Sequence, residues 1–125
     1  MIKLNVLENL SKLRIIPLAN NQNIVISSYE GQIYYLFFSY DSLIVIYNTH
    51  NYDIAINTNK WDYSKTTMRW LKTFINDYTA RHYDNKQQFT YFIYNDANDC
   101  VTRFSDWQRK TKTICLHISN SNRGY

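Results

Sequence analysis

The sequence predicts an α+β domain, in which one or two helices pack on an antiparallel sheet of four to six strands. Two observations support this class. Short apolar runs between residues 24 and 57 alternate with polar turn residues, the pattern of consecutive strands. A clear amphipathic helix follows at residues 64–81. The length of 125 residues fits one core, so we expect residues 1–125 to form a single domain.

The N-terminal residues are expected to include a short helix. Leucines recur three apart within residues 3–14, and Glu8 and Lys12 fall on the opposite side, which is the spacing of an amphipathic helix. Pro17 lies just beyond this segment, and the polar run at residues 19–23 predicts a loop before the sheet begins.

The next part of the chain predicts three consecutive strands. The first covers residues 24–28, after which Glu30-Gly31 supplies a turn. Residues 32–40 are too uniformly apolar for a strand with one face in water, so we expect this strand to be central. Tyr40-Asp41 is a candidate two-residue hairpin loop, and the apolar residues 43–47 should be buried on both faces.

A weaker fourth strand is expected after a turn at residues 48–52. Ile54 and Ile56 alternate there with Asp53, Ala55 and Asn57, which predicts the last strand of the meander. The chain holds only two glycines and one proline, so its turns must be formed by asparagine, aspartate and serine.

The clearest element is the helix expected from Ser64 to about Arg81. The Ser64 hydroxyl can accept a hydrogen bond from a backbone N–H two or three residues later, which makes Ser64 a good N-cap. At about 100° per residue, one arc of this helix is apolar and a second arc is mainly basic. The apolar arc, which we expect to pack on the sheet, consists of Met68, Leu71, Phe74, Ile75 and Tyr78. The basic arc consists of Lys65, Arg69, Lys72 and Asn76.

The pattern weakens beyond Asp84. Residues 89–94 fit either a strand or a buried helical turn, residues 95–99 predict a polar turn, and residues 101–112 fit no single element. Residues 113–119 alternate between apolar side chains and a second side that holds Cys115 and His117, which predicts a strand.

Two stretches resemble a known family. They are Ser39-Tyr40-Asp41-Ser42, before an apolar strand, and Lys60-Trp61-x-x-Ser64-x-Thr66-Thr67-x-Arg69, at a helix start. Together with the strands between them they resemble small uncharacterised proteins encoded by phages and plasmids of low-GC bacteria. That family usually has histidine after the arginine, where this chain has Trp70. The resemblance implies an origin and a hairpin-and-helix core, and it implies no activity.

Charge is unevenly distributed along the chain. The formal net charge is +4, but residues 1–59 carry three Lys or Arg against four Asp or Glu, whereas residues 60–125 carry eleven against six. The basic character therefore belongs to the C-terminal half.

Two groups of basic and aromatic residues in that half are the candidate binding residues, because cations suit phosphates and an indole ring can stack on a base. The first group is Lys65, Arg69, Trp70 and Lys72, and the second is Arg103, Trp107, Arg109, Lys110 and Lys112. An ordinary solvated helix face would have a similar composition, and the interspersed carboxylates weaken a single-sign field.

Other chemistries find little support in the sequence. Cys100, Cys115 and His117 are natural zinc ligands, but their spacing lacks the short cysteine loop of a structural zinc site, so we expect no metal. No glycine-rich phosphate loop is present, and no serine, cysteine or threonine lies beside a local base, so we expect no cofactor and no catalysis.

The expected location is the cytoplasm of a bacterial host. The N-terminus lacks a cleavable signal pattern, and no stretch approaches 18 apolar residues, so we expect no membrane association. Two cysteines in a chain of this size are best interpreted as reduced thiols.

Three functional hypotheses remain from the sequence, and the oligomeric state stays open. The first is a non-enzymatic phage or mobile-element accessory protein that binds a host protein or nucleoprotein complex and inhibits a defence nuclease, in the manner of an anti-CRISPR protein. It depends on the resemblance and on the twelve tyrosines, which exceed what a small core needs. The second is a module that binds DNA or RNA through its basic helix face. The third is an enzyme with an unrecognised site.

Overall fold

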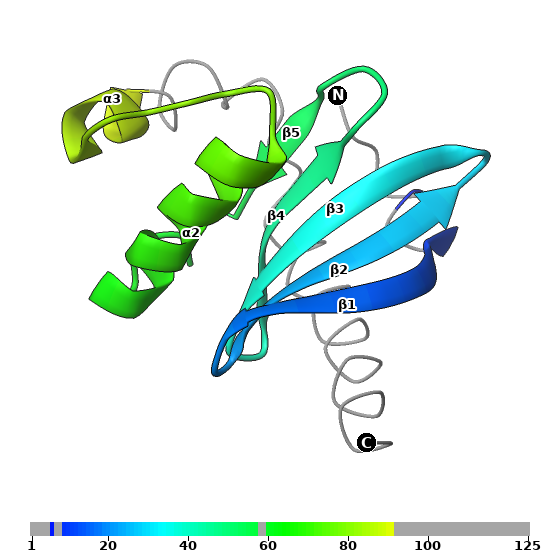
Figure 1. Ribbon diagram of the computed structural model, residues 1–125, viewed down its shortest axis with the longest axis horizontal. Coiled ribbons are helices and arrows are strands. Elements are labelled where there is room, and N and C mark those ends of the chain that lie inside the picture. The colour runs from blue at the N-terminus through cyan, green and yellow to red at the C-terminus, as the bar shows by residue number, and fades with distance from the viewer. Residues whose placement is uncertain (1–5, 7–8, 58–59, 92–125) are drawn as a thin grey trace.

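In a computed structural model of the chain, residues 6, 9–57 and 60–91 are described. They form a five-stranded antiparallel sheet with helices α2 and α3 (Figure 1). The strands pair in the order in which they occur in the chain, so the sheet is a meander. The strands are β1 (Ser11–Ala19), β2 (Gln22–Tyr29), β3 (Gln32–Ser39), β4 (Ser42–Asn48) and β5 (Ile54–Ile56), and the helices are α2 (Lys65–Tyr78) and α3 (Lys86–Tyr91). The predicted α+β class is confirmed.

Three two-residue loops connect the first four strands. They fall at residues 20–21, 30–31 and 40–41. Glu30 and Gly31 both have positive φ, at 50° and 77°, which is the pattern of a type I′ turn whose twist matches that of the flanking strands. Asn21 and Tyr40 also have positive φ, at 61° and 54°. The predicted turns at Glu30-Gly31 and Tyr40-Asp41 are confirmed.

Asn48 organises the turn between β4 and β5. Its Oδ1 accepts the backbone N–H of His50 at 2.8 Å, and its backbone carbonyl accepts the N–H of Tyr52 at 2.9 Å. The turn predicted at residues 48–52 is confirmed. The expected last strand is confirmed as β5, and all three of its residues are buried, including Ala55.

Both faces of the sheet are buried, which explains why β3 and β4 are apolar at nearly every position. Phe37 and Ile24 lie in the core cluster shared with α2, whereas Leu36 and Val25, their neighbours along the strands, lie in a second cluster on the opposite face. Among the described residues, the partly buried hydrophobics packed against that second cluster are Leu10, Ile15 and Tyr29. The predicted central position of β3 and the two-sided burial of β4 are confirmed.

Helix α2 covers one face of the sheet (Figure 1). Leu71, Phe74 and Ile75 are fully buried, and the Phe74 ring stacks on Phe37 of β3 with 5.6 Å between ring centroids. Met68 and Tyr78 are partly buried and pack against the same cluster, so the predicted apolar arc is confirmed. The helix ends at Tyr78 rather than near Arg81, because Thr79 has extended backbone.

The helix predicted over residues 3–14 is wrong from Ser11 onward. Ser11 begins β1, which pairs with β2, and Leu13 is 56% exposed, so the leucine spacing does not mark a buried helix face. Strand pairing overrides the helical periodicity here. Pro17 lies inside β1 and is tolerated because an edge strand does not need its N–H. Val6 and Asn9 have helical backbone, and the rest of the predicted helix lies outside the described residues.

The loop predicted at residues 19–23 is shorter than expected. Only residues 20–21 turn, because Gln22 already pairs with Ser39 at the start of β2. The described part of the ambiguous segment at 89–94 is helical, in α3. The predictions for residues 95–99, 101–112 and 113–119 lie outside the described residues.

Candidate functional site, a basic groove between two helices

Buried hydroxyl groups attach the first turn of α2 to the sheet. Ser64 Oγ accepts the N–H of Thr67 at 3.0 Å, as predicted for the N-cap, and the Ser64 hydroxyl donates to Thr67 Oγ1 at 3.0 Å. Thr67 is fully buried, and its Oγ1 lies 2.7 Å from Ser39 Oγ of β3. The two stretches that carry the family resemblance therefore meet in space, and their contact fixes the position of α2 and its rotation about its own axis.

With its apolar arc against the sheet, α2 turns its basic arc outward. Lys65 and Arg69 are exposed, and Lys72 is partly exposed. The predicted separation of an apolar side and a basic side is therefore confirmed by burial.

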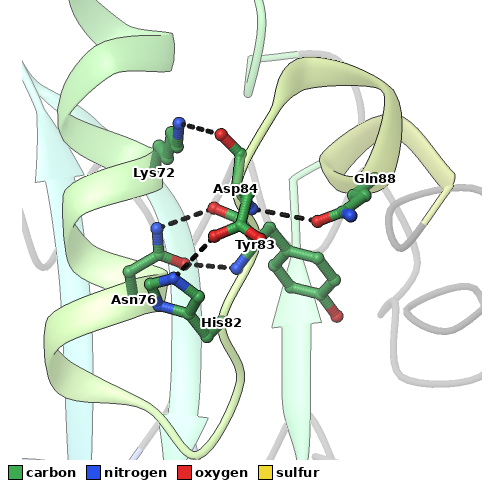
Figure 2. Close-up of polar contacts among 6 residues, drawn as sticks. All are labelled: Lys72, Asn76, His82, Tyr83, Asp84 and Gln88. Carbon is green, nitrogen blue, oxygen red and sulfur yellow. Dashed lines mark hydrogen bonds and ion pairs between the residues drawn. The ribbon is translucent and has the colours of Figure 1, made fainter.

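The chain after α2 folds back along this basic side and is held there by side-chain contacts to its backbone (Figure 2). Asn76 Nδ2 donates to the Tyr83 carbonyl at 2.9 Å, and Asn76 Oδ1 accepts the Tyr83 N–H at 2.8 Å. One turn earlier, Lys72 Nζ donates to the Asp84 carbonyl at 3.0 Å. These bonds place the start of α3 beside α2.

The two helices enclose a groove, which we call the basic groove. Its volume is about 370 Å³, and it is lined by Lys65, Met68, Arg69, Lys72 and Lys86. Among the described residues that line it, Met68 is apolar and the other four are cations from two separate elements. None of the described residues that line it is acidic. The nearby Asp84 directs its carboxylate toward His82, with 3.0 Å between Oδ1 and Nε2.

A second, shallow hollow that is wide open to solvent adjoins α3, and we call it the Tyr-Gln cavity. Its volume is about 440 Å³, and it is lined by His82, Tyr83, Gln87, Gln88 and Tyr91. The backbone of Asp84 bonds to the linings of both cavities. Its carbonyl accepts Lys72 of the basic groove, and its N–H donates to Gln88 Oε1 of the Tyr-Gln cavity at 3.0 Å (Figure 2).

The structure brings some of the predicted binding residues together and separates another from them. Lys65, Arg69 and Lys72 all line the basic groove. Trp70 does not line it, because its side chain packs partly buried against the core cluster, with the Arg69 guanidinium carbon 5.1 Å from its ring centroid. The second predicted group, Arg103, Trp107, Arg109, Lys110 and Lys112, lies outside the described residues.

Sequence reasoning missed Lys86. No local pattern singles out this lysine, since it follows a turn and begins a six-residue helix. The only hint in the sequence was Asn76 on the polar side of α2. Its side-chain amide can form the same pair of hydrogen bonds with a backbone residue as a neighbouring strand does, and it binds Tyr83 in this way.

Two further features of the described residues concern metal binding and membrane insertion. Among the described residues, no three or more His, Cys, Asp or Glu side chains gather where they could hold a metal ion, and Cys100, Cys115 and His117 lie outside this part of the chain. No helix in the described part is long and apolar enough to cross a membrane.

The fold and its groove define the class of this protein. It is a small α+β protein in which a helix with a basic surface covers an antiparallel meander. Residues 11–91 match the model of a family of unknown function, DUF8033, and the chain belongs to this family. The match begins with β1 and ends with α3, so it includes every strand and helix named above. No curated protein and no solved structure matches the chain.

Proposed function

We propose that this protein is a non-enzymatic binding protein whose basic groove takes the phosphate groups of a nucleic acid. The observation that supports this most strongly is the convergence of Lys65, Arg69, Lys72 and Lys86 on one groove with no acidic residue in its described lining. Lysine and arginine are the side chains that most often contact phosphate oxygens.

The convergence of the four cations argues against an ordinary solvated helix face. Such a face usually intersperses both signs, and cations gathered in one place repel one another. Here the hydrogen bonds of Asn76 and Lys72 to the returning chain place a fourth cation, Lys86, against a helix side that is already basic. A bound polyanion would relieve that repulsion and release its own condensed counterions.

A charge-reversal pair tests the proposal. The variant Lys65→Glu/Arg69→Glu should weaken binding of DNA or RNA oligonucleotides at low salt by roughly tenfold or more, because two phosphate contacts become repulsive. The matched control is Lys12→Glu/Arg14→Glu, which makes the same change in net charge on β1, away from the groove. Equal losses in both variants would contradict a localised site, and the absence of binding at any salt would refute the proposal.

A host-protein partner is the second candidate, and one exposed aromatic pair favours it. Tyr40 and Tyr63 are 46% and 48% exposed, and their rings lie edge to face with 6.2 Å between centroids. Lys60 Nζ lies 5.8 Å from the Tyr63 ring centroid. Tyrosine is enriched at the centres of protein interfaces. In this alternative, the protein is a phage or mobile-element accessory protein that acts in the bacterial cytoplasm against a defence nuclease, as anti-CRISPR proteins do.

Affinity capture from a host lysate separates the two candidates. A host-protein function predicts one stoichiometric partner, retained by the Lys65→Glu/Arg69→Glu variant and lost by Tyr40→Ala/Tyr63→Ala. A partner that depends on the basic groove and disappears after nuclease treatment would instead favour nucleic acid.

A further inference from the structure

We infer that the site prefers single-stranded nucleic acid, with a phosphate in the basic groove and an unstacked base in the adjoining Tyr-Gln cavity. This inference rests on the proposed function and adds the class of strand that the site selects. It depends on the chemistry of the second cavity and on its position next to the first.

The lining of the Tyr-Gln cavity suits a nucleobase. Tyr91 supplies an aromatic ring that is accessible because this residue is 64% exposed, and Tyr83, which packs partly buried against the core cluster, also lines the cavity. The amide of Gln87 can both donate to and accept from a base edge, and Nε2 of Gln88 can donate to one, since its Oε1 already accepts the Asp84 N–H. Stacking on an aromatic ring is available to every base, so such a site tolerates sequence variation.

The position of the cavity suits the base attached to a bound phosphate. A single residue, Asp84, bonds to Lys72 on the groove side and to Gln88 on the cavity side. Lys86 of the groove also directly precedes Gln87 of the cavity in the chain. Along a nucleic-acid strand, each base is attached next to a phosphate. A strand whose phosphate lies in the basic groove would therefore carry its base toward the Tyr-Gln cavity.

A duplex cannot use both cavities. Its bases are paired and stacked inside the helix, so their faces cannot stack on a tyrosine ring, and extruding a base costs unpairing energy. A duplex that contacts the site through its phosphates alone should bind with a strong salt dependence and without regard to base sequence. The inferred site therefore gains affinity from single strands only, through stacking.

The test compares the full chain and a Tyr91→Ala variant on three probes of equal length, namely a single strand, a blunt duplex and a strand of abasic sugar-phosphate units, each as DNA and as RNA. We expect the single strand to bind most tightly, and Tyr91→Ala to weaken it by at least about fivefold while leaving the other two probes unchanged. Tyr91→Phe, which keeps the ring, should restore binding. Tyr52→Ala is the control, since Tyr52 is 59% exposed and lies outside both cavities.

Each outcome decides one point. If the duplex and the abasic strand bind as tightly as the base-bearing strand, or if Tyr91→Ala leaves the single strand unaffected, the inference is wrong while the proposed phosphate site stands. If none of the probes binds at any salt, the proposed function fails with it.

Discussion

At the residue scale, asparagine side chains form hydrogen bonds to backbone groups that other backbone groups usually form in turns and strand pairs. Asn48 closes the turn before β5, Asn76 pairs with the backbone of Tyr83, and Asn85 Oδ1 accepts the N–H of Gln88 at 2.9 Å in the first turn of α3. This use of asparagine follows from the scarcity of glycine and proline in the chain. The same amide chemistry becomes destabilising where it is buried without a partner.

Gln22 is such a case and yields the first prediction. Its side chain is fully buried, and among the described residues neither its Nε2 nor its Oε1 has a hydrogen-bond partner. Replacing it by the similarly shaped methionine should raise the free energy of unfolding by about 1–2 kcal/mol, because the desolvation penalty of the amide disappears. Urea denaturation measures the change.

The control is Gln32→Met. Gln32 Oε1 accepts a hydrogen bond from Asn48 Nδ2 at 2.8 Å, so this substitution should destabilise the protein. Equal effects of the two substitutions would show that the Gln22 amide carries no penalty.

Two buried tyrosines predict how stability depends on alkaline pH. Burial raises the pKa of Tyr47 above its ordinary value, and the hydrogen bond from the Ala80 N–H partly offsets this. Burial likewise raises the pKa of Tyr34, and a hydrogen bond from the Asn48 side chain partly offsets this. Because the folded state resists deprotonation, the stabilising contribution is complete below about pH 10 and is lost as pH rises through the folded pKa values.

The measurement is the midpoint of urea unfolding between pH 8 and pH 11. The wild type should lose stability above pH 10, and Tyr34→Phe/Tyr47→Phe should lose less. Parallel losses in the two proteins would assign the alkaline sensitivity to other groups.

At the element scale, α2 depends on the sheet for its position. Its first turn is attached to β3 through Ser39 and Thr67, and its middle is attached through Phe74 on Phe37. The N-cap and both arcs of α2 could be predicted from sequence because capping and 3.6-residue periodicity are local. The contact between Ser39 and Thr67 could not, since it joins residues 28 apart in the chain.

A double-mutant cycle tests that contact. Thr67→Val keeps the shape of the side chain but leaves the buried Ser39 hydroxyl without its partner, so we expect a loss of about 1–3 kcal/mol. Ser39→Ala/Thr67→Val should cost less than the sum of the single changes, because no buried hydroxyl of this pair is then left unsatisfied. Thr66→Val, at the exposed neighbouring position, should have little effect. Additive losses would contradict a direct bond.

Asn76 offers a test of how the groove is assembled. Asn76→Ala removes both hydrogen bonds to Tyr83 without touching a groove residue, so α3 should dock less firmly and nucleic-acid binding should weaken. Hydrogen exchange of residues 81–91 should speed up in this variant. Asp77→Ala, the exposed neighbour, should change neither quantity. Unchanged binding with faster exchange would show that the position of Lys86 is unimportant.

At the scale of the whole molecule, the fold is a meander in which each strand pairs with its neighbour in the chain. Such local pairing made the order of β2, β3 and β4 predictable from three apolar runs and their turns. It did not reveal β1, since Leu10 and Leu13 fit a helical spacing as well as a strand and only pairing with β2 decides between them. One side of the groove could be predicted, because Lys65, Arg69 and Lys72 share one helix. The contribution of Lys86 could not, because this residue comes from another helix.

The salt dependence of binding by the full chain tests the central proposal most directly. With a single-stranded probe, four cations at the phosphates predict that log Ka falls with log[NaCl] with a slope of about −3. Lys65→Ala/Arg69→Ala should reduce the slope to about −1.5, since two phosphate contacts are lost. Lys12→Ala/Arg14→Ala should leave it near −3. A slope that does not change when Lys65 and Arg69 are removed, or that changes equally in the control, would contradict a phosphate site in the basic groove.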